Sequence, residues 1–134
     1  MADKDHKKTV IIVDDDASIR KTFSLLFEKT YRVYLAQDAR EALTRFRNLE
    51  ADLIIADYKL PGLNGMEMIG KFREAGYLGE AILISAYPDQ ISLQDLGRYA
   101  ISQVFVKPPD LDTLLRSVDR LLYLRDVALL IAQA

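Results

Sequence analysis

Short apolar runs alternate along the chain with segments whose apolar residues recur every three or four positions. The runs lie at 9–13, 32–36, 53–56, 81–84 and 104–106. Because these runs are short and rich in β-branched residues, they predict strands buried on both faces. The recurring pattern predicts helices at 17–29, 66–75, 92–100 and 111–132. It predicts a further helix that begins at Asp38 and has Phe46 on its apolar face.

Five strands that alternate with five helices predict an α/β fold with a parallel sheet covered on both faces. We expect the flavodoxin-like (βα)5 doubly wound arrangement, with strand order 2-1-3-4-5 and an extended C-terminal helix. The length of 134 residues predicts a single domain over 1–134, with a core at about 8–122 and a helical extension at 123–134.

Polar residues that can carry chemistry follow four of the predicted strands. Asp14 and Asp15 follow the first strand, Asp57 the third, Ser85 the fourth and Lys107 the fifth. The carboxyl ends of parallel strands share one edge, and strands one and three flank the point where ligands bind in this topology. The sequence therefore predicts one site at that edge.

Clustered carboxylates repel one another at neutral pH and require a cation or a proton. We expect Mg²⁺, or Mn²⁺ in its place, because hard cations prefer oxygen ligands. The competing interpretation is that these aspartates only cap helices and loops, a role that suits Asp16 before the first helix.

A carboxylate, a hydroxyl and a lysine beside such a cation suit phosphoryl transfer. In this interpretation Asp57 is the nucleophile and forms an acyl phosphate. Lys107 contacts one phosphoryl oxygen as a point charge and Ser85 donates a hydrogen bond to another.

Four motifs carry a specific resemblance: VDDD at 13–16, ADYKLPGLNG at 56–65, ISA at 84–86 and VKPP at 106–109. In this order and at strand ends they resemble the receiver domain of two-component response regulators, over about 8–122. The resemblance implies that Asp57 is the phosphoacceptor and that Asp15, Asp57 and the Lys59 carbonyl ligate Mg²⁺. It also implies that Asp14 acts through water and that the Lys107–Pro108 bond is cis.

The resemblance further implies a partner, namely a sensor histidine kinase or a histidine phosphotransfer protein that donates from phosphohistidine. Such a domain catalyses only its own phosphorylation and dephosphorylation and is otherwise not an enzyme. The position three before Lys107, usually aromatic in the family, is Val104 here, and Phe105 follows it. Lys59 and Tyr87 are large residues near the site, so we expect a phosphoryl lifetime of minutes or longer.

Composition limits the other functions. The chain has no cysteine, which excludes disulfides and thiolate chemistry, and its single histidine, His6, is interpreted as solvated. A net charge of −2 gives no basic footprint, so we expect no nucleic-acid binding. No apolar run reaches the length of a membrane span or a signal peptide, so we expect a cytoplasmic protein without membrane contact.

The last helix has more apolar residues than the sheet can cover. Leu124, Val127, Leu130 and Ile131 lie beyond the face expected to pack on the sheet. Exposed apolar stripes commonly meet a partner, which predicts a homodimer or an interdomain contact. The alternatives are a frayed end and a chain that continues into another domain.

Three other functions compete with phosphoryl acceptance. A non-phosphorylated binding module would be expected to lack Asp57, Asp15 or Lys107, and all three are present. A phosphoaspartate hydrolase of the haloacid dehalogenase type would require a cap segment, which the pattern does not show. A flavin protein of the same topology would require a Ser/Thr-rich loop after the first strand, where three aspartates would repel the flavin phosphate.

Overall fold

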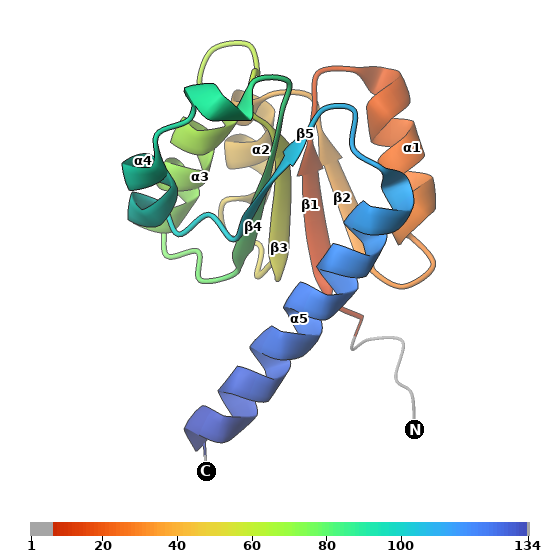
Figure 1. The fold of residues 1–134 in the computed structure, drawn as a ribbon, viewed down its shortest axis with the longest axis vertical. Coiled ribbons are helices and arrows are strands. Elements are labelled where there is room, and N and C mark those ends of the chain that lie inside the picture. The colour runs from red at the N-terminus through yellow and green to blue at the C-terminus, as the bar shows by residue number, and fades with distance from the viewer. Residues whose placement is uncertain (1–6, 134) are drawn as a thin grey trace.

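The computed structural model describes residues 7–133, and these form a five-stranded parallel sheet with helices on both faces (Figure 1). His6 lies outside the described residues. The strands lie in the order β2-β1-β3-β4-β5, as predicted. Their bounds are β1 (Thr9–Val13), β2 (Arg32–Ala36), β3 (Leu53–Asp57), β4 (Glu80–Ser85) and β5 (Gln103–Val106).

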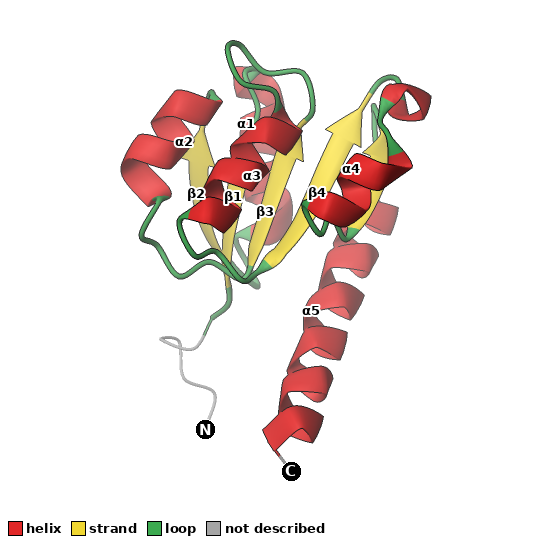
Figure 2. Cartoon of the chain, turned by 90° about the vertical axis from the view of Figure 1, so that its left-hand side faces the viewer, coloured by secondary structure: helices red, strands yellow, loops and turns green. Residues whose placement is uncertain are grey.

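Two helical layers sandwich the sheet, as Figure 2 shows from the side. The helices α2 (Ala39–Phe46), α3 (Gly65–Glu74) and α4 (Leu93–Arg98) cover one face, and α1 (Ala17–Phe27) and α5 (Leu111–Gln133) cover the other. A short 3₁₀ turn, η2 (Pro88–Gln90), precedes α4. Each face has its own apolar cluster, with Phe72 in one and Phe27 in the other.

The sequence determines where the helices begin. Asp16 caps α1 by accepting from the Ser18 and Ile19 amides, which confirms the capping role predicted for it. Asp38 caps α2, and Asn64 forms a reciprocal capping box with Glu67 at the start of α3. The predicted elements are confirmed, with bounds that differ by a few residues at the ends.

The edge of the sheet formed by β5 is only partly covered, since none of the four residues of this strand is buried. Helix α4 has only six residues, and its Leu93 is 85% exposed although Leu96 packs on the core. Val104 packs toward the cluster of α3 and α4, whereas Phe105 is partly buried in the cluster of α1 and α5. This alternation follows from the period of two along a strand.

Helix α5 runs well past the end of the sheet (Figures 1 and 2). Leu114, Val118 and Leu122 are buried against the sheet, as the apolar pattern predicts. Past Leu122 the helix leaves the sheet, and Leu130 and Ile131 are 67% and 70% exposed. At about 1.5 Å per residue the 23-residue helix is about 35 Å long. None of the described helices is both long and apolar enough to cross a membrane.

Candidate functional site at the carboxyl edge of the sheet

The three predicted carboxylates meet at the carboxyl edge of the sheet. Val13 pairs with Ala56, so the residues that follow β1 lie beside Asp57 at the end of β3. Asp14, Asp15 and Asp57 each place a carboxylate oxygen within 4.8 Å of the others. Asp14 and Asp57 are buried and Asp15 is exposed, so the cluster opens to solvent on one side.

Lys107 provides the positive charge at this site. The register between Ser85 and Val106 brings the end of β5 to the same edge. The Lys107 ammonium donates to Asp57 Oδ2 at 2.8 Å and lies 3.8 Å from Asp14 Oδ2. Burial alone lowers the pKa of Lys107, but the hydrogen bond to Asp57 and the charge of Asp14 outweigh it and raise the pKa. Lys107 therefore stays protonated and neutralises part of the cluster.

The pKa of Asp14 is raised above the usual value of an aspartate. Burial raises its pKa, and the charge of Asp57 adds to that effect, while a hydrogen bond from the Asp16 amide at 2.8 Å opposes it. One lysine offsets only part of the repulsion among three ionised carboxylates, and a divalent cation would offset more of it. The donor set, which consists of oxygens only, therefore fits a hard divalent cation.

Asp57 faces an open pocket that a phosphoryl group can enter. The pocket is lined by Asp15, Asp57, Tyr58, Lys59, Leu60, Pro61, Ser85, Ala86, Tyr87, Gln90 and Lys107. The Lys59 amide donates to Asp57 Oδ1 at 3.2 Å, which orients the carboxylate. Ser85 Oγ accepts from the Tyr87 amide at 3.1 Å, so its proton points elsewhere and can be donated to a ligand.

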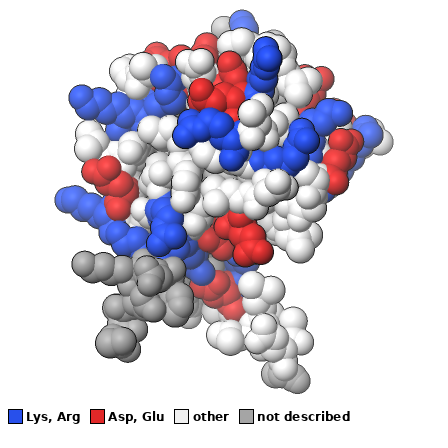
Figure 3. All heavy atoms as spheres, turned by 180° about the vertical axis from the view of Figure 1, so that it is seen from behind, with Lys and Arg blue, Asp and Glu red and all other residues white. Residues whose placement is uncertain are grey.

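The structure brings together the residues predicted from the sequence, which are Asp14, Asp15, Asp57, Lys59, Ser85 and Lys107. The Lys107–Pro108 bond is cis, which confirms that expectation. Figure 3 shows acidic side chains gathered at this end of the molecule, with basic side chains beside them.

Two residues that support the site, Arg20 and Gly65, were not predicted from the sequence. Arg20 on α1 donates to the Asp14 carbonyl at 2.7 Å and so holds the loop after β1. Gly65 lies so close to Asp57 that a Cβ on it would be 2.3 Å from the Asp57 carbonyl oxygen. In the sequence Gly65 is only the last residue of the motif at 56–65, and the reason why no side chain fits there appears only in the folded chain.

Comparisons with known proteins agree with this geometry. The family model described as response regulator receiver domain matches residues 10–119. Sporulation initiation phosphotransferase F of Bacillus subtilis is 27% identical over 117 residues, which covers 87% of this chain and 94% of that protein. The CAI-1 autoinducer sensor kinase/phosphatase CqsS of Vibrio cholerae is 31% identical, but the chain spans only 17% of its length. It spans 26% of another curated relative, the regulatory protein AtoC of Escherichia coli.

Solved structures of receiver domains are also similar to this chain. A CheY-like receiver domain protein from Methanospirillum hungatei superposes with a TM-score of 0.80 and 26% identity, covering 90% of this chain and 98% of that one. The response regulator TrrA of Thermotoga maritima, solved in complex with Mg²⁺ and BeF, is 32% identical with a TM-score of 0.72. The alignment with TrrA covers 85% of this chain and 98% of that chain.

Replacing Gly65 by alanine tests the close approach at the site. The new methyl would collide with the Asp57 carbonyl, so Gly65→Ala should lower the free energy of unfolding by about 1–3 kcal/mol. Urea denaturation measures the change. Gly97→Ala is the matched control, because nothing lies within 4 Å of a Cβ there, and it should stabilise α4 by about 0.5–1 kcal/mol. Equal effects of the two substitutions would contradict the steric explanation.

Proposed function

This chain belongs to the response regulator receiver domain family of two-component signalling, and on that premise we propose that Asp57 is its phosphoacceptor. The observation that supports this assignment most strongly is the Asp57–Lys107 ion pair of 2.8 Å inside a cluster of three carboxylates. We assign Lys107 and Ser85 as the other catalytic residues. Asp14, Asp15, Asp57 and the Lys59 carbonyl are the proposed metal-binding groups.

The proposed reaction is a direct displacement at phosphorus. A carboxylate oxygen of Asp57 forms the new P–O bond while the P–N bond of the phosphohistidine breaks, and the imidazole leaves with that electron pair. The Lys107 ammonium leaves the Asp57 carboxylate and contacts a phosphoryl oxygen. The Ser85 hydroxyl donates a hydrogen bond to another phosphoryl oxygen. A divalent cation would neutralise the charge of the acidic cluster and of the incoming phosphoryl group.

The acidic cluster supports a divalent metal, and we assign Mg²⁺, with Mn²⁺ as an alternative. Receiver domains interact with sensor histidine kinases or phosphotransfer proteins, and sensor kinases are among the relatives of this chain. We propose such a protein as the phosphoryl donor here. In this proposal the chain catalyses only its own phosphorylation and dephosphorylation. We also propose that residues 1–134 form one domain that acts in the cytoplasm and binds neither nucleic acid nor membrane.

We further propose that the end of α5 pairs with the same segment of a second copy. Four of its large apolar side chains are about half exposed or more: Leu124, Leu129, Leu130 and Ile131. Residues 127–133 carry no charge, and Figure 3 shows this projecting segment as free of acidic and basic side chains. An uncharged helical segment with apolar residues of this exposure is stabilised by burial against a similar surface.

Intact mass after incubation with acetyl phosphate and Mg²⁺ tests the phosphoacceptor. We expect one phosphoryl adduct on the wild-type chain and none on Asp57→Asn. Lys107→Ala should slow formation at least tenfold, equivalent to about 1.4 kcal/mol of transition-state stabilisation. Asp16→Asn is the matched control, since asparagine also caps helices, and it should retain the adduct. An adduct on Asp57→Asn would refute the assignment.

The lifetime of the phosphoryl adduct tests whether Lys59 and Tyr87, which we call the pocket rim, shield it from water. Lys59 and Tyr87 line the pocket with Asp57, so they obstruct water that approaches the phosphorus. We expect a half-time of minutes or longer, and a several-fold shorter one in the Lys59→Ala, Tyr87→Ala double variant. Leu93→Ala, which removes an exposed side chain away from the pocket, should change nothing. A wild-type half-time of seconds would show that the rim does not protect the adduct.

Thermal unfolding with and without Mg²⁺ tests the cation site. A ligand at ten times its dissociation constant raises the free energy of unfolding by about 1.4 kcal/mol. We expect this gain in the wild type and in Asp16→Asn, and its loss in Asp15→Asn. If Asp15→Asn gained as much as the wild type, Asp15 would not be a ligand.

Sedimentation equilibrium tests the pairing of α5. Leu130→Asp places a charge in the proposed contact of both copies, so the dimer dissociation constant should rise at least tenfold. Leu78→Asp is the matched control, because Leu78 is 86% exposed and lies on the body of the domain. A wild-type chain that remains monomeric at all accessible concentrations would exclude the dimer.

A further inference from the structure

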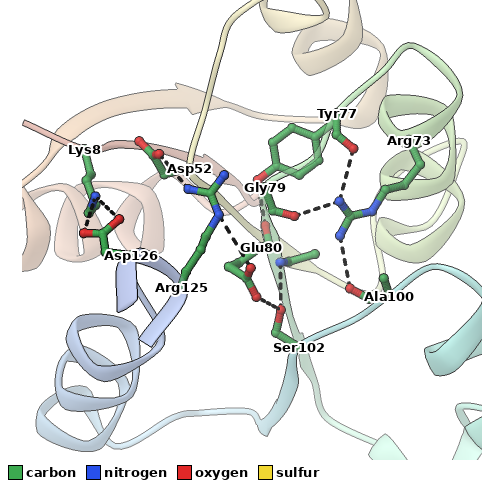
Figure 4. A network of polar contacts seen from close by, with 11 residues as sticks. Lys8, Asp52, Arg73, Tyr77, Gly79, Glu80, Ala100, Ser102, Arg125 and Asp126 are labelled. Atoms are coloured by element: carbon green, nitrogen blue, oxygen red, sulfur yellow. Dashed lines mark hydrogen bonds and ion pairs between the residues drawn. The ribbon is translucent and has the colours of Figure 1, made fainter. Parts of the chain in front are cut away.

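A network of polar contacts lies at the opposite edge of the sheet from Asp57, where α5 leaves the body (Figure 4). Arg125 on α5 donates to Asp52 Oδ1 at 3.0 Å and lies 3.7 Å from Glu80 Oε2. The next residue, Asp126, binds the Lys8 ammonium with both carboxylate oxygens at 2.8 Å. Two successive residues of the helix are therefore tied to three different positions on the sheet side.

The partners of Arg125 are themselves held in place. Asp52, just before β3, accepts the Thr9 amide on its other oxygen at 2.8 Å. Glu80, at the start of β4, accepts from the Ser102 hydroxyl at 2.9 Å. A side chain that is already ordered loses little entropy when it pairs, so these carboxylates are preorganised anchors.

The network begins where apolar contact ends. Leu122 is the last buried residue of α5, and Arg125 comes about one turn later. Arg125 is 23% exposed and its partners Asp52 and Glu80 are 27% and 25% exposed, so water screens these ion pairs only in part. The part of α5 past Leu122 does not pack on the sheet, and a helical segment of that length is only marginally stable in water without packing. Such an end frays easily unless other contacts hold it.

Successive residues point about 100° apart around a helix. Arg125 and Asp126 consequently hold α5 from two directions, one toward Asp52 and Glu80 and the other toward Lys8 (Figure 4). Contacts in one direction alone would leave the helix free to tilt. Contacts in two directions restrict both its tilt and its rotation.

We propose that Arg125 and Asp126 are positioning residues that hold the end of α5 as a rigid arm and so preset how it meets a second copy of the chain. The partner in this inference rests on the proposed self-association, whereas the rigidity of the arm does not. A preordered arm loses less freedom on pairing, so the two ion pairs should also strengthen the dimer.

Distances between two spin labels test the arm directly. Because the chain has no cysteine, Thr44→Cys on α2 and Ala132→Cys on α5 give one labelled pair. The labelled chain is diluted with unlabelled chain so that only distances within one copy are read. We expect a narrow distance distribution, which Arg125→Gln and Asp126→Lys each broaden, as does 1 M NaCl. Exchanging the second pair, with Lys8→Asp and Asp126→Lys together, should restore the narrow distribution.

Arg120→Gln is the matched control, since it makes the same charge change on an exposed position of the same helix. A distribution in Arg125→Gln as narrow as in Arg120→Gln would overturn the proposal, as would failure of the charge exchange to restore order. Arg125→Gln should retain the phosphoryl adduct from acetyl phosphate, which separates this outcome from failure of the phosphoacceptor assignment. Where the wild type dimerises, Arg125→Gln should raise the dissociation constant about two- to fivefold, and no rise would overturn the coupling to pairing.

Discussion

Repulsion among Asp14, Asp15 and Asp57 is the constraint on which the rest of the structure depends. The parallel sheet forces these carboxylates together, because β1 and β3 are neighbours and their carboxyl ends lie at one edge. Lys107 relieves part of the repulsion from a third strand. A sheet with this register therefore gathers three acidic groups and one lysine at a single edge, and this set of oxygen donors suits a divalent cation.

The fold, and the meeting of the candidate site residues at one edge of the sheet, could be predicted from the sequence because both follow from local patterns. Strand periodicity gives the order of elements, and the residue after each strand must lie at the carboxyl edge in a parallel sheet. Asp57 and Lys107 are 50 residues apart, yet both come directly from this rule. The cap role of Asp16 is also local, since it depends only on the amides that follow it.

The contacts that were not predicted join distant segments without any periodic signal. No side chain fits at Gly65 because the Asp57 backbone approaches it, and nothing in the sequence indicates this contact. Arg125 reaches Asp52, which is 73 residues away, and both look like ordinary surface charges in the sequence. Leu93 lies three positions before Leu96 on the same helix, but Leu93 is exposed whereas Leu96 packs on the core.

Charged contacts at both ends of β3 connect the sheet to the segment that carries α5. Asp57 at the carboxyl end binds Lys107, just before α5, and Asp52 at the amino end binds Arg125 within it. Between them Phe105 packs in the cluster of α1 and α5, whereas the residue facing α4 is Val104. The aromatic side chain nearest Lys107 on β5 therefore contacts the α5 side of the sheet.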